Sequence, residues 1–272
     1  MDSAVATGAS HYAFADPRAG ARREITVHLY RPESFRPGNP VLMVMHGRNR
    51  DGADYRDFFI DDSERRGFLV VAPEFSEAQY AHPHDYNYGG MWRADGTFAP
   101  REEWLFPVVD AVFKDASARV GSTRGRYFLF GHSAGAQVVH RLVTFAWSPL
   151  IEGVVAANAG SYTMPVRYEA FPYGLDGPDI DVDLRALFSR PMCVHLGDCD
   201  NDPSHEQLPR DPGAMRQGAH RFARGYNYLE VAKRTAAEAG VPLEWRVAIA
   251  PGVAHSGREM APFAARELFG EP

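Results

Sequence analysis

The chain has 272 residues, 45% of them hydrophobic and 24% charged, which suits a globular protein that buries a large core without disulfide staples. Its formal net charge is −6 at neutral pH, which argues against a general affinity for nucleic acid or for anionic membranes. Its apolar runs are all too short to cross a membrane. We therefore expect no nucleic-acid partner and no membrane span, whereas the oligomeric state is left open.

Seven short segments are predicted to be strands. Residues 25–30 alternate between apolar and polar, which is typical of an antiparallel strand at the edge of a sheet. Most of the others are continuous apolar runs, as expected of strands buried on both faces, and Pro73 is expected to end one of them. The segments are 25–30, 41–45, 68–72, 127–130, 153–157, 192–196 and 243–250.

Helices are predicted between the strands, where apolar residues repeat at helical spacing. The clearest segments are 104–113, 137–146 and 228–239, and a terminal helix contains Met260 and Leu268. Gly240 is expected to end the third of these helices. The alternation of strands and helices implies the α/β class, with a mostly parallel sheet that has helices on both faces.

The chain is predicted to form a single domain over residues 1–272, because it contains no internal repeat and no segment of linker composition. Two segments, 74–101 and 198–224, are long for loops, so we expect them to shape a functional site or to contain small helices. Residues 1–10 are small and polar, so we expect no signal peptide, which favours a cytoplasmic location over that of a mature secreted form. Cys193 and Cys199 are expected to remain unpaired, because a strand residue rarely faces a loop residue six positions on.

The pattern Gly-x-Ser-x-Gly at 131–135 predicts a nucleophile. It follows the apolar strand at 127–130 and precedes the amphipathic helix at 137–146, and this strand–turn–helix setting is the one that an α/β-hydrolase fold requires. The turn has to be tight, so glycines at both ends let the strand and helix backbones pass closely. We therefore predict Ser133 to be the nucleophile, and the alternative is a serine that only caps the helix.

A serine nucleophile needs a base and an orienting carboxylate, which follow it along the chain in this fold. His255 follows the last predicted strand, so we predict it to be the base. Three aspartates follow the strand at 192–196; we favour Asp200 as the acid, then Asp198, then Asp202. Their Asp-x-Asp-x-Asp spacing lacks the glycine and the glutamate of a calcium loop, so we expect no metal there. His46, His132 and His195 are expected to pack around the site.

Acyl transfer also needs donors for the developing oxyanion. The backbone N–H of Ala134, directly after the serine, is predicted to be one. The backbone N–H of Arg48, in the loop after the strand at 41–45, is predicted to be the other. The alternative for that loop is an ordinary turn at the end of a strand.

With these residues placed, the chain resembles the poly(3-hydroxybutyrate) depolymerase-like esterases of the α/β-hydrolase superfamily, and the LpqC-type members in particular. The resemblance covers most of the chain, from about residue 25 to residue 269, and its most specific segment is ANAGSYTMP. It implies hydrolysis of a carboxylic ester without a cofactor. We expect the substrate to be a small ester or a hydroxyalkanoate-type oligoester. The segments that carry it are VMHGRNRD at 44–51, FGHSAGAQVVHRL at 130–142, ANAGSYTMP at 157–165, HLGDCD at 195–200 and PGVAHSGR at 251–258.

Other features of the sequence bear on the substrate and on competing functions. Trp92 and Tyr162 are predicted to wall the substrate pocket, with loop packing as the alternative for both. The cluster of Asp176, Asp179, Asp181 and Asp183 is interpreted as a solvated loop with a helix cap. The competing functions are a peptidase or acyltransferase that uses the same triad, and a binding protein that has kept the fold without its chemistry.

Overall fold

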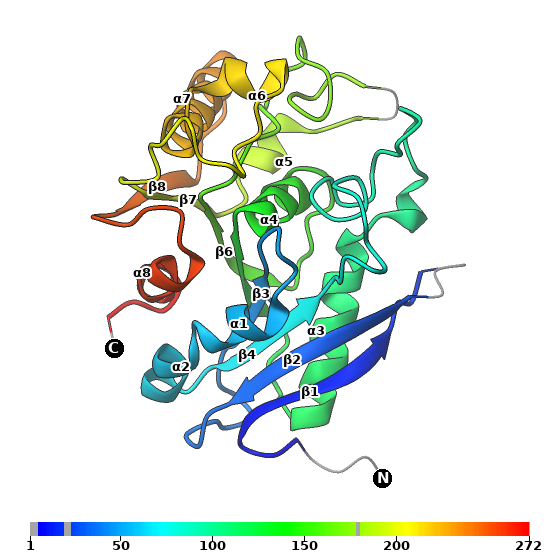
Figure 1. Cartoon of the computed structure of the whole chain (residues 1–272), viewed down its shortest axis with the longest axis vertical. Helices are drawn as coiled ribbons and strands as arrows, with labels where there is room; N and C mark the ends of the chain where they lie inside the picture. Colours follow the sequence, from blue (N-terminus) through cyan, green and yellow to red (C-terminus); the bar gives the residue numbers. More distant parts are fainter. Residues whose placement is uncertain (1–4, 19–22, 178–179, 272) are drawn as a thin grey trace.

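The computed structural model describes residues 5–18, 23–177 and 180–271, and an eight-stranded sheet runs through it (Figure 1). The strand order is β1-β2-β4-β3-β5-β6-β7-β8. The strands from β4 through β3 to β8 are parallel to one another, while β1 and β2 run antiparallel at one side. The bounds are β1 Gly8–Ala15, β2 Glu24–Arg31, β3 Val41–Met45, β4 Leu69–Glu74, β5 Tyr127–His132, β6 Ile151–Ala157, β7 Met192–Gly197 and β8 Trp245–Ala250.

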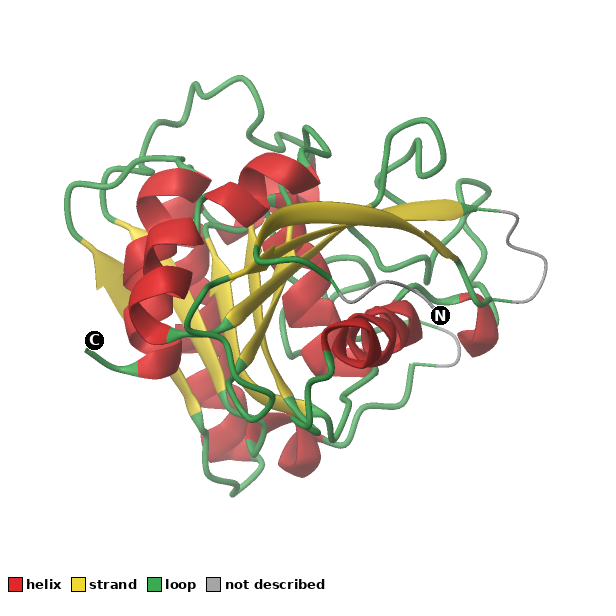
Figure 2. Ribbon diagram, turned by 90° about the horizontal axis from the view of Figure 1, so that it is seen from below, coloured by secondary structure: helices red, strands yellow, loops and turns green. Residues whose placement is uncertain are grey.

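Helices cover both faces of this sheet (Figure 2), which confirms the predicted α/β class. One buried cluster joins the sheet to α3, α4, α5 and α7, and the other joins it to α1 and α8. None of the helices in the described ranges is long and apolar enough to span a membrane. The bounds are α1 Gly52–Asp57, α2 Ile60–Arg66, η1 Arg101–Glu103, α3 Phe106–Val120, α4 Ala134–Phe145, α5 Leu184–Phe188, α6 Pro212–Gln217, α7 Arg221–Glu238 and α8 Gly257–Phe269.

Two predictions about strands are wrong. The segment at 25–30 lies in β2, which is not an edge strand, because β1 pairs with its outer side. The sequence did not reveal β1, since its eight residues include the small Gly8 and Ala15 and each is at least partly exposed. Pro73 does not end β4 either: pairing with β3 covers only residues up to Val71, so the missing N–H of Pro73 removes no bond to that neighbour.

The segment at 198–224 contains more helix than the apolar spacing indicated. It includes all of α6 and the first turn of α7, which begins at Arg221 and not at the predicted residue 228. Arginines fill buried positions of this turn, Arg221 at 1% exposure and Arg224 at 0%, so the apolar repeat stops before the helix does. His220 caps the helix, its ring nitrogen accepting the N–H of Ala223.

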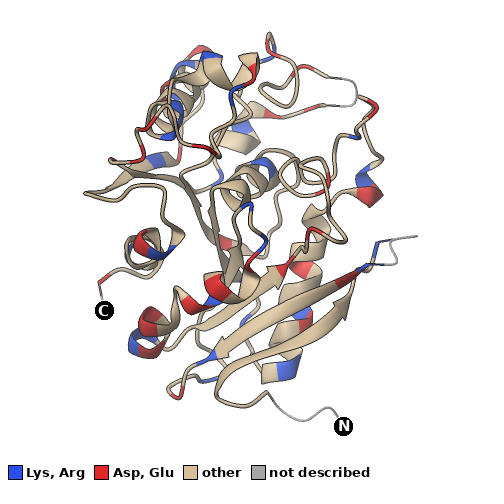
Figure 3. Cartoon of the chain, in the orientation of Figure 1, with Lys and Arg blue, Asp and Glu red and all other residues tan. Residues whose placement is uncertain are grey.

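Acidic and basic residues are interspersed over the helices and loops, and the central strands are almost free of them (Figure 3). Cys193 is buried in β7 and Cys199 is exposed, and both are free thiols, as predicted. In the aspartate-rich loop, Asp183 caps α5 by accepting the N–H groups of Arg185 and Ala186, which confirms the helix cap. Asp179 lies outside the described residues.

Candidate active site

The turn between β5 and α4 has the backbone geometry of a nucleophile elbow. Ser133 has φ 56° and ψ −115°, a conformation that is strained for any residue other than glycine. A Cβ at Gly131 would lie 2.4 Å from the carbonyl oxygen of Gly135, and a Cβ at Gly135 would lie 2.1 Å from that of Met45. The glycines on either side of the serine are therefore required by close backbone approaches, as the sequence pattern predicted.

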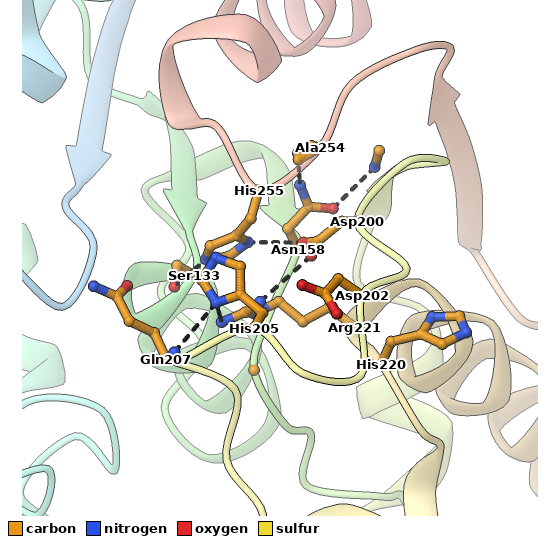
Figure 4. Close-up of polar contacts among 12 residues, drawn as sticks. Ser133, Asn158, Asp200, Asp202, His205, Gln207, His220, Arg221, Ala254 and His255 are labelled. Atoms are coloured by element: carbon orange, nitrogen blue, oxygen red, sulfur yellow. Dashed lines mark hydrogen bonds and ion pairs between the residues drawn. The ribbon is translucent and has the colours of Figure 1, made fainter.

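Ser133, His255 and Asp200 lie together at the carboxyl end of the sheet (Figure 4). The hydroxyl of Ser133 lies 3.0 Å from Nε2 of His255, and Nδ1 of His255 lies 2.7 Å from Oδ2 of Asp200. The serine donates if Nε2 is unprotonated, so the arrangement fits the tautomer in which Nδ1 carries the proton and donates it to the carboxylate. The structure thus brings together the three residues that were predicted from the sequence.

The environment of His255 favours its neutral form. Burial lowers the pKa of His255 below its ordinary value, and the nearby Arg221 and His205 lower it further, whereas Asp200 acts in the opposite direction. Its side chain is only 7% exposed. At neutral pH the ring is therefore able to accept a proton at Nε2.

The three aspartates after β7 have separate environments. Asp200 is 3% exposed and faces His255. Asp198 accepts the backbone N–H of Gly252 at 2.7 Å and so braces the loop that carries the histidine. Asp202 is exposed and accepts the backbone N–H and the hydroxyl of Ser204. Only Asp200 is placed to orient the ring.

The two predicted oxyanion donors are on the elbow and on the loop after β3. The N–H of Ala134 stands in the first turn of α4, where helix geometry provides no acceptor. The N–H of Arg48 has no acceptor among the described residues. The buried ring of His46 holds this loop: its Nε2 accepts the N–H of Phe75 at 3.0 Å, and its Nδ1 lies 2.9 Å from the carbonyl oxygen of Gly47. Burial lowers the pKa of His46 to about 3, so it acts as a neutral brace.

Three adjoining cavities lie along the loop that contains Arg48. Two of them touch Ser133 and have volumes of about 280 and 170 Å³, and the third, of about 530 Å³, extends away from it. Arg48 and Gln207 line all three. His255 lines the smallest one. The candidate site is therefore an extended groove that begins at the serine and continues past Arg48 and Gln207.

The predicted pocket walls Trp92 and Tyr162 do not line this groove. Tyr162 is fully buried and its ring stacks on that of Tyr228, because the segment after β6 turns this side chain into the core and leaves Gly160 and Ser161 on the groove. Trp92 packs on His84 and Phe171 and lines a separate cavity. The first long loop does reach the groove, through Tyr88 and through Pro83 and Asn87, which were not predicted.

Two further buried residues that support the site were not predicted. Asn158, with φ 50°, accepts the N–H of Gly197 at 2.9 Å and donates to the carbonyl oxygen of Ala254 at 3.4 Å. It therefore joins the end of β6 to the acid turn and to the histidine loop. Arg221 lies against Asp200. The motif ANAGSYTMP contains Asn158, but nothing in the sequence pointed to its contacts.

Histidines around the site take the packing roles that were expected of them. His132 is buried, shares a hydrogen bond of 2.7 Å with the hydroxyl of Tyr55, and its ring centroid lies 4.7 Å from that of His255. Burial holds the pKa of His132 well below its ordinary value. His195 is likewise buried, in β7, and burial lowers its pKa to about 4.

Comparison with known proteins gives two close structural relatives. Poly(aspartic acid) hydrolase-1 from Sphingomonas sp. KT-1 has 35% sequence identity and a TM-score of 0.91 over 97% of this chain and 100% of its own. LpqC, a poly(3-hydroxybutyrate) depolymerase from Bordetella parapertussis, has 37% identity and a TM-score of 0.90 over 97% of this chain and 91% of its own. An S-formylglutathione hydrolase from Agrobacterium tumefaciens, at 15% identity and a TM-score of 0.58, shares the fold. No protein-family model matches the sequence, and no curated protein matches it significantly.

Proposed function

Since the chain belongs to the LpqC-like family of α/β-hydrolases, we propose that it is a serine hydrolase that cleaves carboxylic esters through Ser133, His255 and Asp200. The observation that carries the proposal is the continuous set of contacts from the Ser133 hydroxyl through both ring nitrogens of His255 to Asp200. The strained backbone of Ser133 supports it, because such strain persists where function requires it.

The first half of the reaction forms an acyl-enzyme. The Ser133 oxygen attacks the ester carbonyl carbon while Nε2 of His255 takes its proton, and Asp200 stabilises the imidazolium that forms. The carbonyl oxygen becomes an oxyanion, which the N–H groups of Ala134 and Arg48 bind. The tetrahedral intermediate then expels the alcohol, which receives the proton from His255.

The second half repeats these steps with water. His255 takes a proton from a water molecule, whose oxygen attacks the acyl carbon bound to Ser133. Collapse of the second tetrahedral intermediate returns the proton to the Ser133 oxygen and releases the carboxylic acid. No cofactor takes part in this scheme.

We infer that the substrate is a small ester or an oligoester. The groove supports this inference, since cavities of about 280 and 170 Å³ touch Ser133 and an adjoining cavity of about 530 Å³ continues away from it, which gives room for a chain longer than a single ester group. The relative that is described as a poly(3-hydroxybutyrate) depolymerase supports it too.

One observation favours amide hydrolysis as a second candidate function. A relative with 35% identity is described as a poly(aspartic acid) hydrolase, and the bonds of that polymer are amides. The same triad cleaves either bond, and the leaving group decides which reaction is fast. An ester reaction needs less help from His255, because an alkoxide leaves more readily than an amide nitrogen.

The decisive experiment is labelling with a fluorophosphonate probe, with Ser133→Ala as the control. We expect wild-type protein to be labelled on Ser133 and the variant to be unlabelled; equal labelling of both would contradict the proposal. Initial rates on short p-nitrophenyl esters, a 3-hydroxybutyrate oligomer and an aspartate oligomer then rank ester against amide substrates. Faster turnover of the aspartate oligomer than of every ester would favour the second candidate.

A further inference from the structure

A buried arginine touches the carboxylate that faces His255. Arg221 is 1% exposed, and its Nη1 lies 3.4 Å from Oδ1 of Asp200, the oxygen that His255 does not use (Figure 4). Apart from His255, no other side chain in the described ranges hydrogen-bonds to this carboxylate. The backbone is tied as well, because the N–H of Phe222 donates to the carbonyl oxygen of Asp200 at 3.1 Å.

The guanidinium of Arg221 also contacts the chain segment that lies beside His255. We call residues 202–209 the strap. Nη2 of Arg221 lies 3.5 Å from Nδ1 of His205 in the strap, and the ring of His205 stands edge-on to that of His255, with centroids 5.2 Å apart. Further along the strap, the side-chain amide of Gln207 donates to Asn49 beside the oxyanion loop at 3.4 Å. The strap therefore joins the acid turn to the oxyanion loop, and Arg221 contacts it at His205.

We propose that Arg221 is a positioning residue for the catalytic triad: one buried cation fixes both Asp200 and His205, and through them the ring of His255. The inference rests on the proposed function of Ser133 and His255. Two nitrogens of a rigid planar group contact two different partners, which a point charge on a flexible chain does not reproduce. Burial of an arginine is costly, and here the contact with the carboxylate of Asp200 offsets part of that cost.

The charge of Arg221 also bears on the proton affinity of the base. The titratable and charged groups that face His255 are Asp200, Arg221, His205 and His132. Burial is the main cause of the lowered pKa of His255, and Arg221 contributes in the same direction. Removing this cation takes away one of the contributions that oppose Asp200, so the pKa of His255 rises. A residue that only supports the fold would not have this effect.

The test compares Arg221→Met and Arg221→Lys with the wild-type protein. The readouts are the pH dependence of fluorophosphonate labelling, kcat and KM on a short ester, and thermal unfolding. For Arg221→Met we expect labelling slower by roughly tenfold or more, and a lower kcat with little change in KM. The acidic limb, which is the pH range over which the labelling rate rises as His255 loses its proton, should move upward by roughly one pH unit. Arg221→Lys retains the charge, so its limb should stay near that of the wild type while its rate is only partly restored.

Arg190→Met is the matched control. Arg190 is a half-buried arginine that donates to the backbone carbonyls of Val143 and Thr144, and it lies away from the groove. The Arg190→Met variant should be labelled at the wild-type rate, and its acidic limb should lie at the same pH as that of the wild type. A folded Arg221→Met protein whose limb coincides with that of the wild type would overturn the inference, whatever its rate.

Failure to fold is also informative. If Arg221→Met does not fold, Arg221→Lys decides, and a folded lysine variant with the wild-type rate would overturn the inference. If neither folds, the double variant Asp200→Asn/Arg221→Met decides: a folded protein shows that the cation serves Asp200, and an unfolded one assigns Arg221 to the fold alone. Absence of labelling in the wild-type protein would instead defeat the proposed function.

Discussion

The nucleophile turn and the acid turn each place a group within hydrogen-bonding distance of His255, yet they are held in place by different kinds of contact. Residues 131–135 take their shape chiefly from their own sequence: the two glycines allow β5 and α4 to pass closely, against the carbonyl oxygen of Met45, and the backbone N–H of Ser133 donates to Ala157. Asp200 is fixed by distant residues, above all Arg221, which is 21 positions further along the chain. The serine is therefore readable from five consecutive residues, whereas the support of the aspartate is visible only in three dimensions.

The largest expected effect distinguishes the aspartates of the acid turn. Asp200→Asn should lower kcat by about four orders of magnitude, because the amide favours the wrong tautomer of His255. Asp198→Asn, the control, keeps an acceptor for the N–H of Gly252 and should lower the rate less than about tenfold. Steady-state kinetics on a short ester measures both. The opposite ranking would move the triad acid to Asp198 and remove the basis of the comparison.

A smaller effect is expected at the residue that joins the two turns. Asn158→Ala removes both side-chain bonds, leaves the N–H of Gly197 unsatisfied and puts an alanine at positive φ. We expect the free energy of unfolding to fall by about 2 kcal/mol and kcat by roughly tenfold. Glycine adopts the positive φ of this position without strain, so any loss of stability or of kcat that remains in Asn158→Gly is due to the missing side chain.

Urea unfolding and ester kinetics measure these effects at Asn158. Asn39→Ala is the matched control, since Asn39 also bridges two loops, by donating to the carbonyl oxygen of Gly67 at 2.9 Å, but outside the groove. Asn39→Ala should lower the free energy of unfolding but leave kcat of the folded protein near the wild-type value. A wild-type kcat in Asn158→Ala would show that the acid turn does not need the contact with Asn158. It would then depend less on distant residues than the comparison with the nucleophile turn implies.

Sequence patterns predicted what local geometry determines and failed where tertiary packing decides. The residues that we propose as nucleophile, acid and base follow from glycines, strand ends and chain order, and the structure brings these three residues together. The prediction that Tyr162 lines the pocket was wrong, because the direction of its side chain depends on how the segment after β6 turns, which a single sequence does not reveal. Arg221 was missed for a related reason, since a buried arginine resembles a surface one in a sequence.

The smallest expected effect concerns the strap. The wild-type labelling rate should rise with pH through a limb below pH 6.5, because burial lowers the pKa of His255 and only the neutral ring accepts a proton. His205→Asn keeps an acceptor near the position of Nδ1 for the N–H of Gln207, which lies 3.2 Å away, but removes the titratable ring from beside His255.

The limb of His205→Asn should therefore move upward, and only by roughly a few tenths of a unit, because burial and Arg221 still act on the base. Labelling rates across the acidic range measure this shift, and Glu206→Gln, at the neighbouring position, is the control for a change of charge in the strap. A downward shift in His205→Asn would show that His205 raises the proton affinity of His255. If the limb moved as far in His205→Asn as in Arg221→Met, the pKa of His255 would be controlled by the strap and not by α7.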